Sequence, residues 1–265
     1  MLANASLIGL VSCGSADEQL IGFDIDLAKA VGENLGVDVR FQEIQWDKKK
    51  IELSSGQIDL IWNGLTITEE RREAMEISSP YMVNSQVIVA KKSFNSEIKS
   101  DSAFTVAFEK GSAGDDVFNN NDIFSSCTPV ECGAQVNALT EVLSGTSQLA
   151  IIDSFMARYY IASKTSYKDL QIVTSYNLTD EYYGIAGRKG EKGFIANVNE
   201  ALTAAFKSGK TAQIANEYGL SASLYEPEDF SSYADVKETS SWESIKSKGC
   251  MTIGYTVFTP IAYFK

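Results

Sequence analysis

The residues best suited to hold an ion are one arginine, one aspartate and one short turn. Arg71 lies in the segment TITEERRE, and its planar guanidinium can bind both oxygens of a carboxylate. Asp153 ends a run of four apolar residues, so a buried strand would place its carboxylate where the charge needs a partner. Gly111, Ser112 and Ala113 precede a predicted helix, whose first N–H groups favour an anion. These residue types can hold anionic and cationic groups.

Arg71 and Asp153 also have purely structural interpretations. Arg71 follows a predicted N-cap, Thr68, and can be a solvated residue on the first turn of that helix. Asp153 can be the N-cap of the helix that follows it, and this role is compatible with ion binding. Residue type alone does not decide between these interpretations, so the elements around both residues have to be considered.

The overall composition narrows the available chemistry. The chain has 265 residues, and 23 Lys+Arg against 35 Asp+Glu give a net charge of −12, which argues against nucleic acid or an acidic membrane as a partner. There is no histidine, so triads that use histidine, His-ligated zinc and imidazole acid–base catalysis are excluded. Catalysis is left to carboxylates, Lys or Tyr, and we expect neither a metal nor a cofactor.

The cysteines and the N-terminus leave alternatives open. Cys127 and Cys132 bracket a short loop containing Pro129, which suits either a local disulfide or two free thiols. Leu10-Val11-Ser12-Cys13 fits the lipobox pattern, in which the cysteine is acylated, but a basic n-region and most of the apolar stretch are missing. A short apolar strand or an expression remnant is an equal alternative. No apolar run reaches the ~20 residues needed to span a bilayer.

From Gln19 onward, helix-like and strand-like segments alternate, which is typical of an α/β fold. The segment GFDIDLAKAVGENLG carries apolar residues one helical turn apart and ends on Gly36, a good C-cap. Residues 37–41 and 57–62 have the patterns of strands. We expect the second strand to end in a turn at Asn63-Gly64 before the helix that contains Arg71.

The middle third of the chain has the pattern of an insertion between two strands, at 86–90 and 182–186. We therefore predict two α/β lobes joined by two crossover strands, with a ligand bound in the cleft between the lobes. The predicted boundaries are an N-terminal remnant or strand at 1–18, a first lobe made of 19–87, 184–225 and 242–265, a second lobe at 88–183, and an acidic, Ser-rich linker at 226–241.

Three separated motifs, in this order, resemble one protein family. GFDIDLAKAVGENLG, DLIWNGLTITEERREAMEISSPY and YGIAGRKG are similar to segments of the polar amino-acid family of bacterial solute-binding proteins, the extracellular receptors of ABC importers. The resemblance covers residues 19–225 and 242–264. It implies the type II periplasmic-binding fold, each lobe a central sheet flanked by helices. It also implies a location outside the cytoplasm, in the periplasm or at the cell surface as a lipoprotein.

The order of the elements departs from this family. WESIKSKGCMTIGYTVFTPIAYF, at the C-terminus, resembles the beginning of such a protein, so we predict a circular permutation in which 226–241 joins the old ends. The alternative is a fragment of a tandem array, with SLIGLVS at 6–12 as a degenerate first strand. We expect a monomer, although the last strand can also pair with a neighbouring molecule in a domain-swapped dimer.

The resemblance also implies ligand contacts. Arg71 and donors at Thr66 would bind the carboxylate of a free amino acid, completed by the turn at Gly111, Ser112 and Ala113. The carbonyl of Gly64 and the carboxylate of Asp153 would bind the ammonium. The resemblance further assigns two aromatic walls and two side-chain contacts, which are Trp46, Phe258, Asn63 and Glu109.

We therefore expect a binding protein without catalytic residues, which closes on an amino acid and delivers it to the permease of an ABC importer. A Glu109 that faces the pocket would favour a cationic or amide-bearing ligand, but Glu109 can equally point to solvent. Two alternatives stay open. One is an enzyme on the same scaffold, similar to cyclohexadienyl dehydratase, with Glu109 as the acid or base. The other is an engineered, permuted amino-acid sensor module.

Overall fold

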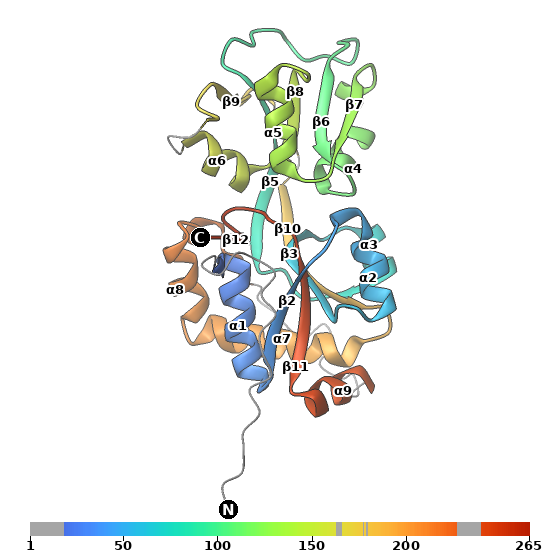
Figure 1. The fold of residues 1–265 in the computed structure, drawn as a ribbon, viewed down its shortest axis with the longest axis vertical. Helices are drawn as coiled ribbons and strands as arrows, with labels where there is room; N and C mark the ends of the chain where they lie inside the picture. Colours follow the sequence, from blue (N-terminus) through green and yellow to red (C-terminus); the bar gives the residue numbers. More distant parts are fainter. Residues whose placement is uncertain (1–18, 163–165, 177, 179, 227–239) are drawn as a thin grey trace, which may run out of the picture.

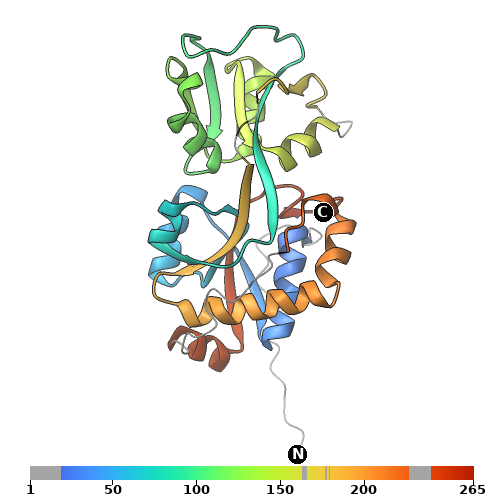
Figure 2. The ribbon, with the colours of Figure 1, turned by 180° about the vertical axis from the view of Figure 1, so that it is seen from behind.

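Two lobes lie one above the other along the long axis of the molecule (Figure 1). The computed structural model describes residues 19–162, 166–176, 178, 180–226 and 240–265. Two long strands, β5 (Met82–Lys91) and β10 (Asp180–Arg188), cross between the lobes and pair antiparallel over residues 82–85 and 180–183 (Figure 2). The predicted two-lobed α/β architecture is confirmed.

The lower lobe is built on a sheet in the order β2-β11-β3-β10, with β4 also paired to β10. Helices α1, α7 and α8 lie on one side of this sheet, and α2 and α3 lie on the other (Figure 1). The elements are β1 (Leu20–Ile21), α1 (Phe23–Leu35), β2 (Asp38–Glu43), η1 (Trp46–Lys48), α2 (Lys49–Ser55), β3 (Leu60–Thr66), α3 (Glu69–Ala74), β4 (Met75–Ile77), α7 (Lys192–Lys207), α8 (Lys210–Glu217), η3 (Ser221–Ser223), α9 (Ser240–Lys248), β11 (Cys250–Tyr255) and β12 (Tyr263–Phe264).

The upper lobe continues from the crossover strands in the order β5-β8-β6-β7, with β9 paired to β5. Strand β6 runs parallel to both of its neighbours, so the carboxyl ends of β6 and β8 point toward the lower lobe together (Figure 1). The elements are β6 (Thr105–Glu109), α4 (Ala113–Asn120), η2 (Asp122–Phe124), β7 (Thr128–Cys132), α5 (Gln135–Ser144), β8 (Leu149–Asp153), α6 (Ser154–Ala162) and β9 (Leu170–Ile172).

The C-terminal segment supplies a central strand of the lower lobe. Strand β11 lies between β2 and β3 and is parallel to both, with Ile253 opposite Phe41 on one side and Leu60 on the other. Its residues Met251 and Ile253 are fully buried. The described part of the chain therefore needs this segment to complete the sheet. The alternative first strand, at 6–12, lies outside the described residues, as does most of the predicted linker.

Strand β3 brings several lower-lobe residues to the cleft, and it contains a bulge. Its register with β10 shifts between Gly184 and Ala186, and Gly64 has a φ of +62°. A Cβ at Gly64 would lie 2.7 Å from the Phe258 ring, so both this close contact and the positive φ require glycine at this position. The predicted turn at Asn63-Gly64 is wrong, because both residues lie inside the strand, where the bulge bends the backbone.

Several local expectations are confirmed and others are corrected. Gly36 ends α1 in the left-handed conformation, and the Thr68 hydroxyl accepts the Arg71 N–H as an N-cap. Cys127 and Cys132 do not bracket a loop, since the chain between them is the extended strand β7, and both are free thiols. A five-residue extended span of roughly 17 Å is beyond the reach of a disulfide.

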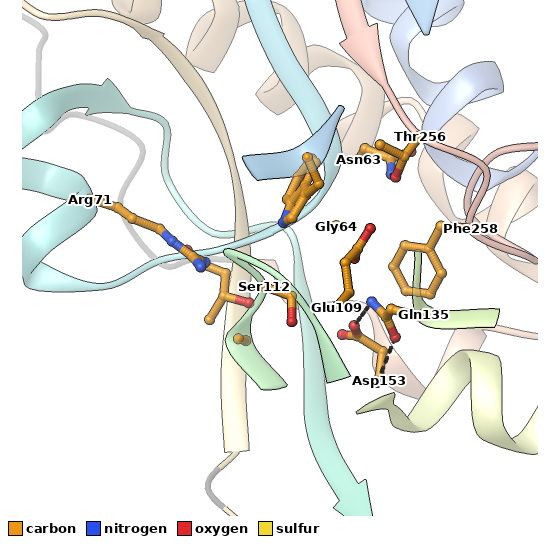
Figure 3. Close-up of a pocket in the computed structure, with 12 residues that line it drawn as sticks. Asn63, Gly64, Arg71, Glu109, Ser112, Gln135, Asp153, Thr256 and Phe258 are labelled. Carbon is orange, nitrogen blue, oxygen red and sulfur yellow. Dashed lines mark hydrogen bonds between the residues drawn. The ribbon is translucent and has the colours of Figure 1, made fainter. Parts of the chain in front are cut away.

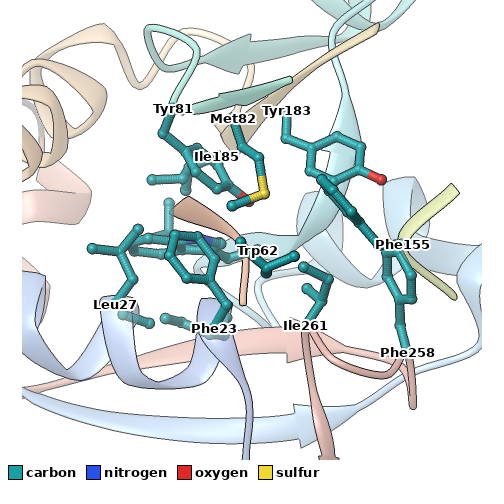
Figure 4. Packing of buried hydrophobic residues seen from close by; sticks show 14 of the residues in the cluster. Phe23, Leu27, Trp62, Tyr81, Met82, Phe155, Tyr183, Ile185, Phe258 and Ile261 are labelled. Carbon is teal, nitrogen blue, oxygen red and sulfur yellow. The ribbon is translucent and has the colours of Figure 1, made fainter. Parts of the chain in front are cut away.

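One large apolar cluster extends from the lower lobe through the junction into the upper lobe, and Figure 4 shows the part of it around the junction. Phe23 of α1 stacks on Tyr81 in the lower lobe. Phe155 of α6 meets Tyr183 edge to face at 6.1 Å between ring centroids, and Phe258 belongs to the same cluster. The core therefore reaches the base of the cleft from both lobes. None of the described helices is long and apolar enough to cross a membrane.

Candidate ligand-binding site

A pocket lies between the lobes, and residues of both lobes line it (Figure 3). Every residue predicted to contact a ligand lines this pocket except Gly111, and the structure adds Gln135 and Thr256. The lining residues are Trp46, Asn63, Gly64, Thr66, Arg71, Thr256 and Phe258 from the lower lobe, and Glu109, Ser112, Ala113, Gln135 and Asp153 from the upper lobe.

Arg71 is buried and held at one end of the pocket. Its backbone N–H is bonded to the Thr68 cap, which fixes the first turn of α3. The guanidinium donates from Nη1 to the Thr66 carbonyl at 2.8 Å and from Nη2 to the Asp116 carboxylate of α4 at 3.1 Å. These bonds orient the planar group and join the two lobes. The solvated alternative for Arg71 is therefore wrong.

The bulge in β3 is held by a buried carboxylate. Asp24, in the first turn of α1, accepts the Gly64 N–H at 2.7 Å and the Tyr81 hydroxyl at 2.9 Å. Burial raises the pKa of Asp24 to about 7, against the effect of these bonds. Next to Gly64, the Asn63 amide donates to the Thr256 hydroxyl at 3.0 Å. The Asn63 side-chain oxygen has no hydrogen-bond partner within the described residues.

Asp153 ends β8 at the other end of the pocket. Its carboxylate accepts hydrogen bonds from the Asn84 amide at 2.5 Å, from the Gln135 amide and from the Tyr183 hydroxyl. The Gln135 oxygen accepts the Asp153 N–H at 2.9 Å, so the two residues are bonded in both directions (Figure 3). Burial raises the pKa of Asp153 despite these donors. All of the donors are neutral, so no cation compensates the charge among them.

A second acid, Glu181, lies behind Asp153 at the start of β10. It accepts hydrogen bonds from the Thr66 hydroxyl at 2.8 Å, the Asn84 amide at 2.5 Å and the Gln86 amide at 2.8 Å. Burial first, and then the charge of Asp153, raise the pKa of Glu181 to about 8. Glu181 thus connects both crossover strands to Thr66 and, through Asn84, to Asp153. The sequence carried no signal for this role beyond an acid in a strand.

Glu109, the last residue of β6, faces the pocket rather than solvent. It is only 4% exposed and extends from the upper lobe toward Gly64 (Figure 3). Burial first, and then repulsion from Asp153, raise its pKa to about 8, and the nearby Lys49 charge offsets part of this. The question left open by the sequence, whether Glu109 points inward, is therefore answered.

The turn before α4 differs from the prediction. The Ser112 hydroxyl is the N-cap and accepts from Gly114 and Asp115, while the Gly111 N–H donates to the Asp115 carboxylate at 2.8 Å. The Ser112 N–H donates to the Glu109 carbonyl at 3.2 Å. The expected anion-binding role of three N–H groups is therefore reduced to Ala113, whose N–H has no bond within the described part of the chain.

Two of the lining residues were missed by sequence reasoning. Gln135 opens α5 in a segment without charge or motif, and only its contact with Asp153 reveals it. Thr256 lies two residues before Phe258 in TVFTP, directly after β11, where a polar residue at the end of a buried parallel strand is a usable signal. Trp46 and Phe258 are buried and form the aromatic walls.

The fold and the site define a two-lobed binding protein with its pocket at the cleft that the two long strands cross. Comparison with known proteins gives the family. Residues 11–221 match the model of the bacterial extracellular solute-binding proteins, family 3, and the chain belongs to this family. The resemblance found in the three motifs is thereby confirmed, and with it the type II periplasmic-binding fold.

Individual relatives agree with this assignment. A probable histidine-binding protein of Neisseria gonorrhoeae is 28% identical over 203 residues, 74% of each chain. An ancestral arginine-binding protein bound to arginine is 31% identical with a TM-score of 0.70, covering 75% of this chain and 88% of the other. An ancestral amino-acid-binding protein described as a precursor of cyclohexadienyl dehydratase is 30% identical with a TM-score of 0.65, covering 74% and 84%. Cys13 lies outside the described residues, so lipid attachment stays a prediction.

Proposed function

We propose that this protein captures a free amino acid with a cationic side chain and hands it to an ABC importer. In this proposal the ligand carboxylate binds the Arg71 guanidinium and the Ala113 N–H. The ammonium binds Asp153, because a buried carboxylate with only neutral donors is best compensated by a cation. Contacts from both lobes then favour the closed arrangement, so ligand binding shifts the population toward it.

One observation carries the choice of a cationic side chain. Among the described lining residues the charged ones are Arg71, Asp153 and Glu109, one cation and two acids. A zwitterionic backbone satisfies Arg71 and Asp153 and leaves Glu109 without a partner charge, so that its carboxyl is mostly protonated at neutral pH until a cation binds beside it. A ligand side chain that carries a positive charge balances it, whereas an acidic side chain would add a second buried repulsion. The arginine-bound and histidine-binding relatives support the same class of ligand.

A thermal-shift screen of the twenty amino acids tests this proposal. Arginine, lysine or histidine at about 100 times its dissociation constant should add roughly 2.7 kcal/mol to the free energy of unfolding, which for a protein of this size corresponds to about 5–10 °C. Glutamine should give a smaller shift, because its neutral amide forms a hydrogen bond with Glu109 but no ion pair. The largest shift coming from aspartate or glutamate would contradict the proposal.

The same geometry makes one enzymatic activity worth testing. A Glu109 with a pKa of about 8 is mostly protonated at neutral pH and could serve as a general acid, as in a dehydratase. We propose binding without turnover, since relatives of this chain include an amino-acid-binding protein described as a precursor of such an enzyme. When a carboxylated cyclohexadiene is incubated with the protein, its ultraviolet absorbance should stay unchanged because no conversion takes place. Formation of an aromatic product would contradict the receptor proposal and indicate an enzyme.

We further propose that the C-terminal segment completes the lower lobe of its own chain, in circularly permuted order, and that the protein is a monomer. Support comes from the position of β11 between β2 and β3, where it has partners on both sides. Light scattering after size exclusion should give the mass of one chain. A dimer that dissociates only on unfolding would instead indicate exchange of β11 between molecules.

A further inference from the structure

One buried cation in the cleft has no part in the ligand contacts described above. Lys49, the first residue of α2, is 4% exposed, although lysine is almost never buried without a charged partner. Its ammonium donates to the Trp46 carbonyl at 3.0 Å and to the Gly111 carbonyl at 2.7 Å, and it lies 4.6 Å from the centroid of the Trp46 ring. Among the described residues, no carboxylate lies within 4.0 Å of it.

The two carbonyls belong to different lobes. Trp46 is in the lower lobe, while Gly111 is in the upper-lobe turn that also carries Ala113. The lobes approach closely at this turn, where a Cβ on Gly111 would lie 3.2 Å from the Asp47 Cα and 3.5 Å from the Lys49 ammonium. Opening of the cleft would therefore remove the Gly111 carbonyl and return the ammonium to water.

The charges that face Lys49 do not balance it. Arg71 of α3 and Lys50 of α2 repel the ammonium, while Glu109 of β6 and Asp116 of α4 attract it from beyond ion-pair distance. Desolvation is nevertheless the largest effect and lowers the pKa of Lys49 to about 7. A charge that must leave water for two neutral carbonyls destabilises the closed arrangement, even when its donors are satisfied.

We propose that Lys49 is a positioning residue that limits the stability of the closed cleft: its ammonium is desolvated each time the Gly111 turn closes over it, and this keeps ligand release fast. The proposal rests on the proposed function only in taking closure as the step that traps the ligand. The direction in which pH shifts the equilibrium between the open and closed cleft follows from the burial of Lys49. A group whose pKa falls on closing from its ordinary value to about 7 favours closure increasingly as the pH rises above 7.

The Lys49→Met variant tests this inference, because it keeps the length of the side chain and removes the charge. Its dissociation constant for L-arginine at about pH 7 should be at least tenfold lower than that of the unchanged protein, mainly through slower dissociation in stopped-flow measurements. Above the pKa of Glu109, from about pH 8 to 9, the affinity of the unchanged protein should still rise by up to tenfold per pH unit, and in the variant this rise should disappear. Equal or weaker binding by Lys49→Met would overturn the proposal.

Two further variants separate charge from packing. Lys49→Arg keeps a charge that cannot be neutralised, so its affinity should stay low at about pH 8.5. Lys50→Met removes the neighbouring lysine, whose bond to Glu70 lies within the lower lobe, and should leave the affinity and the pH profile unchanged. If Lys50→Met bound L-arginine as tightly as Lys49→Met does, the effect would be one of overall charge, and the role assigned to Lys49 would be overturned.

A measurement without ligand keeps the inference separate from the proposed function. Small-angle X-ray scattering should give a smaller radius of gyration for Lys49→Met than for the unchanged protein at about pH 7, because more molecules are closed. The two radii should approach each other as the pH rises from about 7 toward the ordinary pKa of lysine, about 10.4. If no amino acid binds but this difference is seen, the proposed function fails and the role of Lys49 stands. Identical radii at about pH 7 would sink the role of Lys49 alone.

Discussion

Replacing Arg71 by alanine is expected to raise the dissociation constant for L-arginine about 100-fold or more, as measured by titration calorimetry. Arg71 is the sole cation among the described residues that line the pocket, and it is held by the Thr66 carbonyl and Asp116. Removing one partner of a desolvated, hydrogen-bonded charge pair costs about 2–5 kcal/mol. Arg71→Lys should retain only part of the affinity, since a point charge cannot bind a carboxylate through two parallel bonds.

Two control variants decide whether Arg71 acts on the ligand or only on the lobes. Arg72→Ala, at the next position of the same helix, should leave the affinity within about twofold. Asp116→Ala removes the salt bridge across the cleft, whose carboxylate is about half exposed and is therefore worth no more than about 1 kcal/mol. A loss of affinity in Asp116→Ala as large as in Arg71→Ala would mean that Arg71 merely joins the lobes.

Replacing Glu109 by glutamine is expected to weaken the binding of L-arginine by about 30-fold at about pH 8.5, while L-glutamine loses less than about threefold. A buried charge-assisted hydrogen bond contributes about 1.5–3 kcal/mol, and only the cationic side chain would form it. The amide introduced by Glu109→Gln keeps the size of the side chain, so packing against Ser112 and Gln135 is little changed. Equal losses for the two ligands would contradict a charge-selecting role for Glu109.

The pH dependence gives an independent check on Glu109. Its pKa is about 8 in the closed pocket and should fall when a cation binds, so binding below pH 8 requires release of a proton. The affinity for L-arginine should therefore weaken as the pH falls below about 8, by up to tenfold per unit, and calorimetry in two buffers should detect the released proton. Glu109→Gln should lose this proton release. Lys49 affects the affinity above about pH 7, and the Lys49→Met variant separates the two effects.

The helices, the strands and most of the residues that line the pocket could be predicted from the sequence, because short motifs and local rules govern them. The Thr68 cap and the Gly36 terminus depend on hydrogen bonds within a few residues, and both are present. Asp153 is at the end of a buried strand, as its apolar neighbours indicate. The error at Asn63-Gly64 has a clear cause. A left-handed glycine is typical of turns, and only pairing with β10 shows that this one bends a strand.

The cysteines and Gly111 also show that local sequence does not reveal the partners of a segment in the folded chain. Pro129 suggested a loop between Cys127 and Cys132, but that segment is extended because β7, at the edge of the sheet, pairs with β6. Gly111 precedes a helix, as an anion site requires, but Asp115 takes its N–H and Lys49 its carbonyl. Both outcomes depend on partners that sequence spacing does not reveal.

The sequence by itself determined the family, the α/β elements and the two oppositely charged residues, Arg71 and Asp153, that line the pocket, since these depend on short motifs and periodicity. Only the tertiary structure decided which charges share one desolvated pocket. Glu109 and Asp153 become neighbours because parallel strands β6 and β8 end at the same edge, and Lys49 is buried because the Gly111 turn of the other lobe covers it. Desolvation depends on what packs over a group, and for these residues that is a segment distant in the chain.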